Sequence, residues 1–251
     1  MKRINNNEKF LIITATHGDE AFSIPVVAKL ENLYPQRFNN IVGNPLALQQ
    51  GKRFVNLDLN RVAPGAEKSK IYEVKRANYL INKSKDFLFL LDIHGSDANC
   101  GIFTIITNPT PANVLLAYAL PITRIVIWGS KNNGRAIGPL SRFVNCGVGI
   151  ECGPKKSNLI SKVLLKTLKN FLSAKFPNFK RANEKELYQV FGKIKDGEIN
   201  KSQKKKLKDF KEIKINGQKF FPLLVNQYKD EKIVCYKMEK VNFYGKFSFS
   251  Y

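Results

Sequence analysis

Short apolar segments alternate with segments of helical periodicity along most of the chain, and this alternation restricts the fold more than any other feature. The expected strands are rich in β-branched residues and occupy residues 10–16, 41–43, 87–93, 102–107, 122–128 and 147–152. The expected helices carry apolar residues at three- and four-residue spacing and occupy residues 21–33, 67–82, 114–119 and 158–174. Ser157 is suited to cap the last of these helices. Strands that alternate with helices predict an α/β layer fold with a mixed or mostly parallel sheet.

The pattern changes near residue 179. From there on, short β-like stretches are separated by turn signals, KDG at residues 195–197 and NG at residues 216–217. We therefore expect two parts, a main α/β domain of residues 1–178 and a small β domain of residues 179–251.

Composition argues for a cytoplasmic, water-soluble protein. No apolar run approaches the ~20 residues of a membrane span, and the apolar segment near the N-terminus is too short for the core of a signal peptide. The four cysteines are scattered without a CxxC pair, which favours reduced thiols over a disulfide framework or a structural zinc site. We expect them to be small core residues.

The only two histidines both follow expected buried strands. His17 stands in HGDE with Glu20 three residues later, and His94 stands in LLDIHGSD. Two strand-end histidines and a glutamate form a His₂Glu set, which binds catalytic zinc and leaves a fourth position open. A surface histidine or a helix-start carboxylate is the alternative for the HxxE pair alone. Asp92 shares the strand face of His94 and either orients an imidazole or caps a nearby loop.

Two further features suit hydrolytic chemistry. Glu151, in VGIECGP, ends another hydrophobic strand, where a carboxylate is costly to bury without a purpose. The loop GKRFVNLDLNR contains Arg53, Asp58, Asn60 and Arg61, and arginine can donate two hydrogen bonds to a carboxylate or a developing oxyanion. The alternative for this loop is a solvated turn.

These motifs together resemble a known family. HGDE, NPLA with KRFVNLDLNR, LDIH and GIECGP occur in the order and at the separations typical of the succinylglutamate desuccinylase and aspartoacylase family of zinc-dependent deacylases, over about residues 10–160. The resemblance implies a carboxypeptidase-like three-layer α/β/α sandwich with a small C-terminal β domain. It also implies one Zn²⁺ per chain and hydrolysis of the amide bond of small anionic N-acyl amino acids rather than a main-chain peptide bond.

The resemblance assigns a role to each matching residue. His17, Glu20 and His94 correspond to the zinc ligands, and Glu151 to the general base. Arg53 corresponds to the arginine that polarises the scissile carbonyl, while Asn60 and Arg61 correspond to the pair that holds a substrate carboxylate.

Two positions depart from the family pattern. The family has a further arginine about ten residues before the base, for which Arg142 and Arg135 are both candidates. It also has a substrate-binding tyrosine in the C-terminal domain, for which Tyr236 is the first choice and Tyr228 and Tyr244 remain open.

The high positive charge of the chain raises the question of a nucleic-acid-binding function. The net charge is +22, and residues 155–214 hold 18 basic and 6 acidic residues. The run KSQKKKLKDFKEIK at residues 201–214 has one aromatic residue, Phe210, so a solvated basic face that attracts anionic substrate is expected rather than a nucleic-acid binder. A metallocarboxypeptidase acting on peptides is the second enzyme hypothesis. The acyl group, the native divalent metal and a possible homo-oligomeric state stay open.

Overall fold

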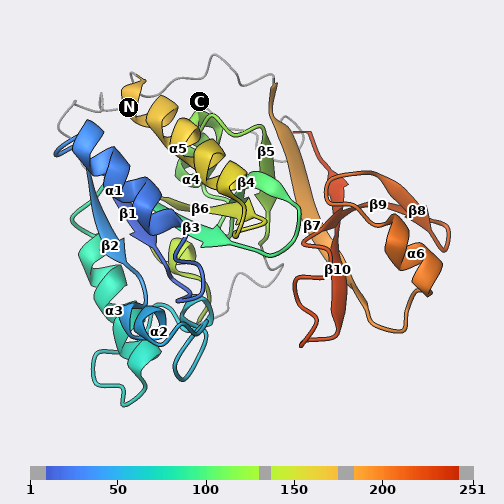
Figure 1. Cartoon of the computed structure of the whole chain (residues 1–251), viewed down its shortest axis with the longest axis horizontal. Coiled ribbons are helices and arrows are strands. Elements are labelled where there is room, and N and C mark those ends of the chain that lie inside the picture. The colour runs from blue at the N-terminus through green and yellow to red at the C-terminus, as the bar shows by residue number, and fades with distance from the viewer. Residues whose placement is uncertain (1–9, 130–136, 175–183, 243–251) are drawn as a thin grey trace.

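The structure is a computed structural model that describes residues 10–129, 137–174 and 184–242. Its described strands form one mixed ten-stranded sheet in the order β2-β1-β3-β6-β4-β5-β7-β10-β9-β8 (Figure 1). The strands are β1 (Phe10–Thr14), β2 (Phe38–Val42), β3 (Phe89–Gly95), β4 (Gly101–Ile106), β5 (Arg124–Ile127), β6 (Gly147–Gly153), β7 (Glu186–Lys195), β8 (Ile213–Ile215), β9 (Gln218–Leu223) and β10 (Ile233–Lys240). The helices are α1 (Ser23–Leu33), α2 (Pro45–Gln49), α3 (Tyr72–Ser84), α4 (Pro111–Ala119), α5 (Asn158–Ser173) and α6 (Lys201–Lys206), with 3-10 turns η1 (Leu59–Arg61) and η2 (Leu140–Arg142).

The sheet is parallel where it builds the central region and antiparallel at its C-terminal end. β1 pairs in parallel with β2 and β3, and β3 pairs in parallel with β6. β4 lies antiparallel to β6, while β5 is parallel to both β4 and β7. β7, β10, β9 and β8 then continue as an antiparallel set. The carboxyl ends of β1, β3 and β6 therefore meet at one edge of the sheet.

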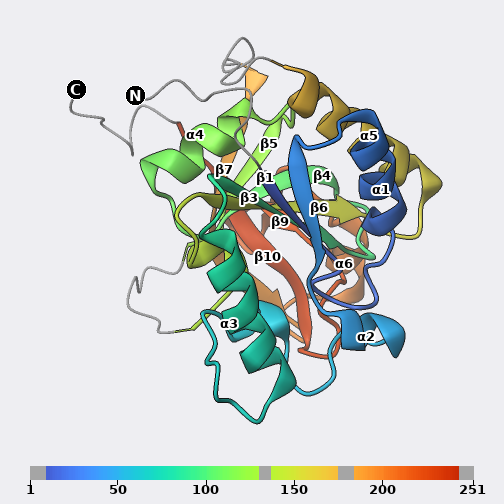
Figure 2. The same cartoon turned by 90° about the vertical axis from the view of Figure 1, so that its left-hand side faces the viewer.

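Helices cover both faces of the central sheet. Along β1, Phe10 and Ile12 pack with α1, α4 and α5 on one face, whereas Leu11 and Ile13 pack with α3 on the other. This alternation follows from the two-residue period of a strand, so a strand buried on both faces is apolar throughout. Figure 2 shows α1 and α5 beside each other and α3 apart from them. The three-layer arrangement expected from the sequence is present.

The helix expected at residues 67–82 begins later, at Tyr72, because the residues before it are turns. Ser69 accepts a hydrogen bond from the Ile71 amide through its hydroxyl (3.1 Å), and the Ala66 amide donates to the Val74 carbonyl (3.2 Å). The periodic apolar pattern thus begins before the first residue of the helix. Ser157 caps α5 as expected, accepting from the Leu159 amide (3.2 Å).

The C-terminal region contains a helix that the sequence analysis missed. α6 lies inside the lysine-rich run and begins with a capping box, in which Asn200 and Gln203 each accept a hydrogen bond from the other's backbone amide (both 2.9 Å). The reciprocal bonds satisfy two amides that a helix start leaves unpaired, which stabilises this short helix.

The proposed boundary between two domains falls near residue 179. Strands from either side of this boundary belong to one sheet, because β7 pairs with β5 in register from Arg124 opposite Glu186 to Ile127 opposite Gln189. The division into residues 1–178 and 179–251 stays a prediction. All four cysteines are buried and free, as expected of core residues. Within the described part of the chain, no helix combines the length and apolar character that crossing a membrane requires.

Candidate active site

Three neighbouring strands deliver the predicted site residues to the carboxyl edge of the sheet. His17 and Glu20 follow β1, His94 is the penultimate residue of β3, and Glu151 lies near the end of β6. Parallel pairing of β3 with β6 places His94 directly opposite Glu151. The carboxyl edge of an open α/β sheet is where such folds usually bind ligands.

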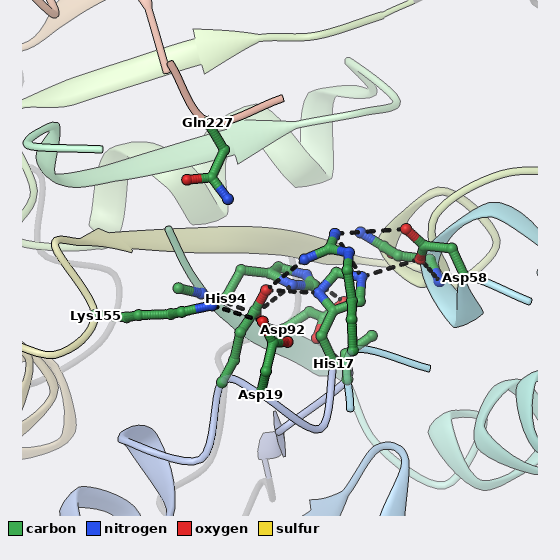
Figure 3. Close-up of polar contacts among 12 residues, drawn as sticks. His17, Asp19, Asp58, Asp92, His94, Lys155 and Gln227 are labelled. Atoms are coloured by element: carbon green, nitrogen blue, oxygen red, sulfur yellow. Dashed lines mark hydrogen bonds and ion pairs between the residues drawn. The ribbon is translucent and has the colours of Figure 1, made fainter. Parts of the chain in front are cut away.

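His17, Glu20 and His94 form a compact buried cluster, whose two histidines are labelled in Figure 3. Each offers one ligand atom, and these atoms all lie within 4.8 Å of one another. The Nδ1 atom of His17 lies 2.8 Å from Glu20 Oε1, and the Nδ1 atom of His94 lies 3.5 Å from Glu20 Oε2. The three side chains therefore point toward a common position.

The outward-facing nitrogen of each imidazole meets a second carboxylate. His17 Nε2 lies 3.0 Å from Asp58 Oδ1, and His94 Nε2 lies 2.9 Å from Asp92 Oδ2. Asp92 also accepts a hydrogen bond from the Thr16 hydroxyl (2.6 Å). A carboxylate behind each histidine is the usual outer shell of a zinc site, because it fixes the ring and makes the inner nitrogen a better ligand. The nitrogen and oxygen donor set thus fits a divalent metal such as zinc.

Charge within the cluster shifts the protonation of its members. Burial alone would lower the pKa of His17 and His94, but adjacent carboxylates outweigh it and raise both above their ordinary value. Burial opposes ionisation of Glu20 as well, yet the two imidazoles hold its pKa well below the usual range. The carboxylates thus favour the protonated form of each imidazole, and the imidazoles favour the ionised form of Glu20.

Glu151 behaves differently from Glu20 although both are buried. Its side chain is 8% exposed, and burial, followed by the negative charge of Glu20, raises its pKa to about 7. A carboxyl whose pKa lies near neutrality can both accept and release a proton at physiological pH. Glu151 is thus suited to proton transfer, whereas Glu20 is suited to hold a cation.

Arg53 approaches the same cluster from the loop between α2 and η1. Its Nη1 donates to Glu20 Oε1 (3.1 Å) and its Nη2 donates to Asp58 Oδ2 (3.4 Å). The backbone carbonyl of Arg53 accepts from the Gly18 amide (3.1 Å), which ties the loop to the segment that carries His17. The Arg53 guanidinium therefore lies beside the candidate metal cluster.

A cavity of about 740 Å³ opens over this cluster. The predicted site residues that line it are His17, Glu20, Arg53, Asn60, Arg61, His94, Arg142 and Glu151, together with Tyr228 and Tyr236. The two other open candidates, Arg135 and Tyr244, lie outside the described residues. The side-chain oxygen of Asn60 accepts from the Leu140 amide (3.2 Å), which holds η1 next to the η2 turn that carries Arg142.

Aromatic side chains form one wall of the cavity. Trp128 packs edge-on against Tyr236 with ring centroids 4.5 Å apart, and Tyr236 packs against Tyr228 at 5.6 Å. Burial, together with the charge of Glu151, raises the pKa of Tyr228 above its ordinary value. Tyr228 therefore lies close enough to Glu151 to be affected by its charge, and both tyrosines line the cavity.

Two side chains near the site, Gln227 and Lys155, make contacts that no sequence pattern predicted. Gln227, just before Tyr228, accepts from the backbone amides of Asp97 (2.7 Å) and Ala98 (3.3 Å) through its side chain. Lys155 is 8% exposed and its Nζ lies 2.7 Å from Asp19 Oδ2 (Figure 3). These bonds join loops distant in sequence, so only the folded arrangement reveals them.

The fold and the site together define a class, α/β proteins with a candidate His₂Glu metal centre at the carboxyl edge of the sheet and a carboxyl group suited to proton transfer beside it. The family described as the succinylglutamate desuccinylase/aspartoacylase catalytic domain matches residues 6–174. The chain belongs to this family.

Known relatives agree with the assignment. A probable aspartoacylase of Prochlorococcus marinus (strain MIT 9515) is 30% identical over 167 residues, which cover 61% of this chain and 56% of that protein. A probable aspartoacylase of Trichodesmium erythraeum is 26% identical over 231 residues, which cover 79% of this chain and 78% of that protein. The match to the Prochlorococcus protein thus spans little more than half of that protein's length.

Solved structures share the fold. Murine aminoacylase 3 superposes with a TM-score of 0.71 at 18% identity, covering 95% of this chain and 97% of that one. The succinylglutamate desuccinylase from Chromobacterium violaceum superposes with a TM-score of 0.69 at 15% identity, covering 95% and 86% of the respective chains. The carboxypeptidase-like α/β architecture expected from the sequence is confirmed.

Proposed function

We propose that the protein is a zinc-dependent amidohydrolase that deacylates small anionic N-acyl amino acids. The observation that carries the proposal is the buried His₂Glu cluster, with a carboxylate behind each imidazole and Glu151 and Arg53 on the same cavity. Family membership supports a deacylase, and the free buried thiols support a reducing, cytoplasmic location.

His17, Glu20 and His94 would hold one Zn²⁺ per chain. Bound zinc acts as a Lewis acid toward a carbonyl oxygen and lowers the pKa of water, which makes water a nucleophile at neutral pH. The chain's own part is to orient both imidazoles toward the ion, which Asp58 and Asp92 do by occupying their outer nitrogens.

Glu151 serves as the general base. It accepts a proton from the attacking water and then returns this proton to the departing amine nitrogen, since the amine is a poor leaving group unless protonated. Arg53 donates to the oxyanion that develops on the substrate carbonyl, where a preorganised donor stabilises the transition state more than the ground state.

The remaining polar groups of the cavity suit an acidic substrate. Asn60, Arg61 and Arg142 lie on two adjoining turns, η1 and η2, and would bind a substrate carboxylate opposite the scissile bond. Tyr236, on β10, or Tyr228, in the turn between β9 and β10, would complete this pocket. The high positive charge of the chain would raise the local concentration of an anionic substrate.

The test is release of free amine by zinc-loaded protein from a panel of N-acyl amino acids that includes N-acetylaspartate and N-succinylglutamate. Turnover of at least one member, lost on chelation and restored by zinc, is the expected result. No turnover across the panel, with release of C-terminal residues from short peptides instead, would contradict the proposal in favour of a carboxypeptidase.

A further inference from the structure

The segment between Arg53 and Asp58 has little side-chain packing to hold it in place. The side chains of Phe54, Asn56 and Leu57 are exposed, and that of Val55 is only partly buried. This segment nevertheless joins Arg53, which reaches the candidate metal cluster, to Asp58, which contacts His17. Some other interaction must therefore fix its backbone.

Glu73, in the first turn of α3, supplies that interaction. Its side chain is fully buried, with Oε1 accepting from the Val55 amide (2.6 Å) and Oε2 accepting from the amides of Asn56 (3.1 Å) and Leu57 (3.2 Å). Three consecutive amides thus converge on one carboxylate, an arrangement that forms an anion-binding concavity in the backbone. In this protein the Glu73 carboxylate occupies the concavity.

A second buried side chain connects Glu73 to the rest of the sheet edge. The Asn44 side chain donates to Glu73 Oε1 (3.3 Å) and accepts from the Ala47 amide (3.1 Å), which caps α2. Asn44 begins the NPLA motif, so this motif has a structural task distinct from substrate contact. All four donors to Glu73 are N–H groups, so its carboxyl group takes part only as an acceptor.

We propose that Glu73 is a positioning residue that sets the active-site geometry of Arg53. The inference rests on the proposed deacylase function and adds a residue that does not itself line the cavity. Arg53 lies two residues before the anchored amides, and Asp58 lies one residue after them. Because catalysis depends on sub-ångström placement of donors, loss of the anchor is expected to slow chemistry while leaving the metal ligands intact.

The first test is Glu73→Gln, which keeps the shape but replaces one acceptor oxygen with an NH₂ group that cannot accept from the loop amides. We expect kcat to fall by about tenfold to a hundredfold, with the zinc content unchanged. Hydrogen exchange of the Val55, Asn56 and Leu57 amides is expected to accelerate by about tenfold or more in the metal-loaded protein. Leu164→Ala, which removes a buried side chain from α5, serves as the control for general destabilisation.

A double-mutant cycle separates positioning from a structural role. Because Glu73 acts through Arg53, adding Glu73→Gln to an Arg53→Ala protein is expected to lower kcat by less than about threefold further. Glu73→Asp, which keeps the charge but retracts it by one methylene, is expected to give an intermediate loss and replaces Glu73→Gln if that variant does not fold.

The outcomes are distinguishable. Wild-type protein without turnover on any N-acyl amino acid would refute the proposed function, and unchanged exchange of the three amides in Glu73→Gln would separately refute the anchor. Active wild-type protein with an undiminished kcat in Glu73→Gln, or with a full further loss in the Arg53→Ala background, would overturn the positioning role. A kcat loss in Leu164→Ala equal to that in Glu73→Gln would also overturn it.

Discussion

Replacement of Glu151 by glutamine should stabilise the metal-free protein and abolish the activity of the zinc-loaded protein. Burial and the charge of Glu20 raise the pKa of Glu151 from an ordinary value of 4.5 to about 7, so ionising this residue works against folding. The protonated form of Glu151 contributes favourably to the free energy of unfolding. This contribution is fully present below pH 4.5 and is lost as pH rises through about 7. At 1.36 kcal/mol per pKa unit, the loss above that pH amounts to about 3 kcal/mol.

Urea unfolding in the presence of a chelator measures this effect. Between about pH 5 and about pH 8, the free energy of unfolding of Glu151→Gln should rise relative to wild type by about 2–3 kcal/mol, because glutamine does not titrate. Glu31→Gln, at an exposed position on α1, is the control and should show no comparable dependence on pH. A difference between Glu151→Gln and wild type that stays constant or shrinks as pH rises would refute the electrostatic reasoning for this site.

Three further substitutions test other parts of the site. Arg53→Lys should lower kcat by about a hundredfold with unchanged zinc content, since lysine cannot reproduce the two-pronged donation of arginine; unaltered kcat would remove Arg53 from the mechanism. Lys155→Met should lower the free energy of unfolding measured with urea by about 1–3 kcal/mol because it leaves a carboxylate unpaired, whereas the exposed neighbour Lys156→Met should stay within about 0.5 kcal/mol. Tyr228→Phe should raise KM by about tenfold and by more than Tyr236→Phe does, and the reverse order would favour Tyr236 as the substrate-binding tyrosine.

The central α/β fold was predictable because the strands β1, β3 and β6 are mostly apolar and buried on both faces, and each long helix carries one apolar stripe. The start of α3 at Tyr72 was not, since the turn before it depends on the Ser69 hydroxyl rather than on hydrophobic periodicity. The α6 helix was missed because its lysines carry no apolar stripe, although the Asn200 and Gln203 capping pair was visible in the sequence.

The candidate metal cluster was predictable for a different reason. The chain has only two histidines, and both lie at or just beyond the carboxyl ends of buried strands that a parallel sheet brings together. By contrast, the anchor at Glu73 depends on main-chain amides whose direction no side-chain pattern encodes. The contact between Lys155 and Asp19 spans 136 residues and likewise has no local signal.

The central claim is that one zinc ion, held by His17, Glu20 and His94, enables deacylation. The most direct measurement is amine release from the best substrate of the N-acyl amino acid panel while chelated protein is titrated with zinc. The account predicts turnover that rises with added zinc and saturates at one ion per chain. Turnover that survives chelation, or that does not depend on zinc up to one equivalent, would contradict it.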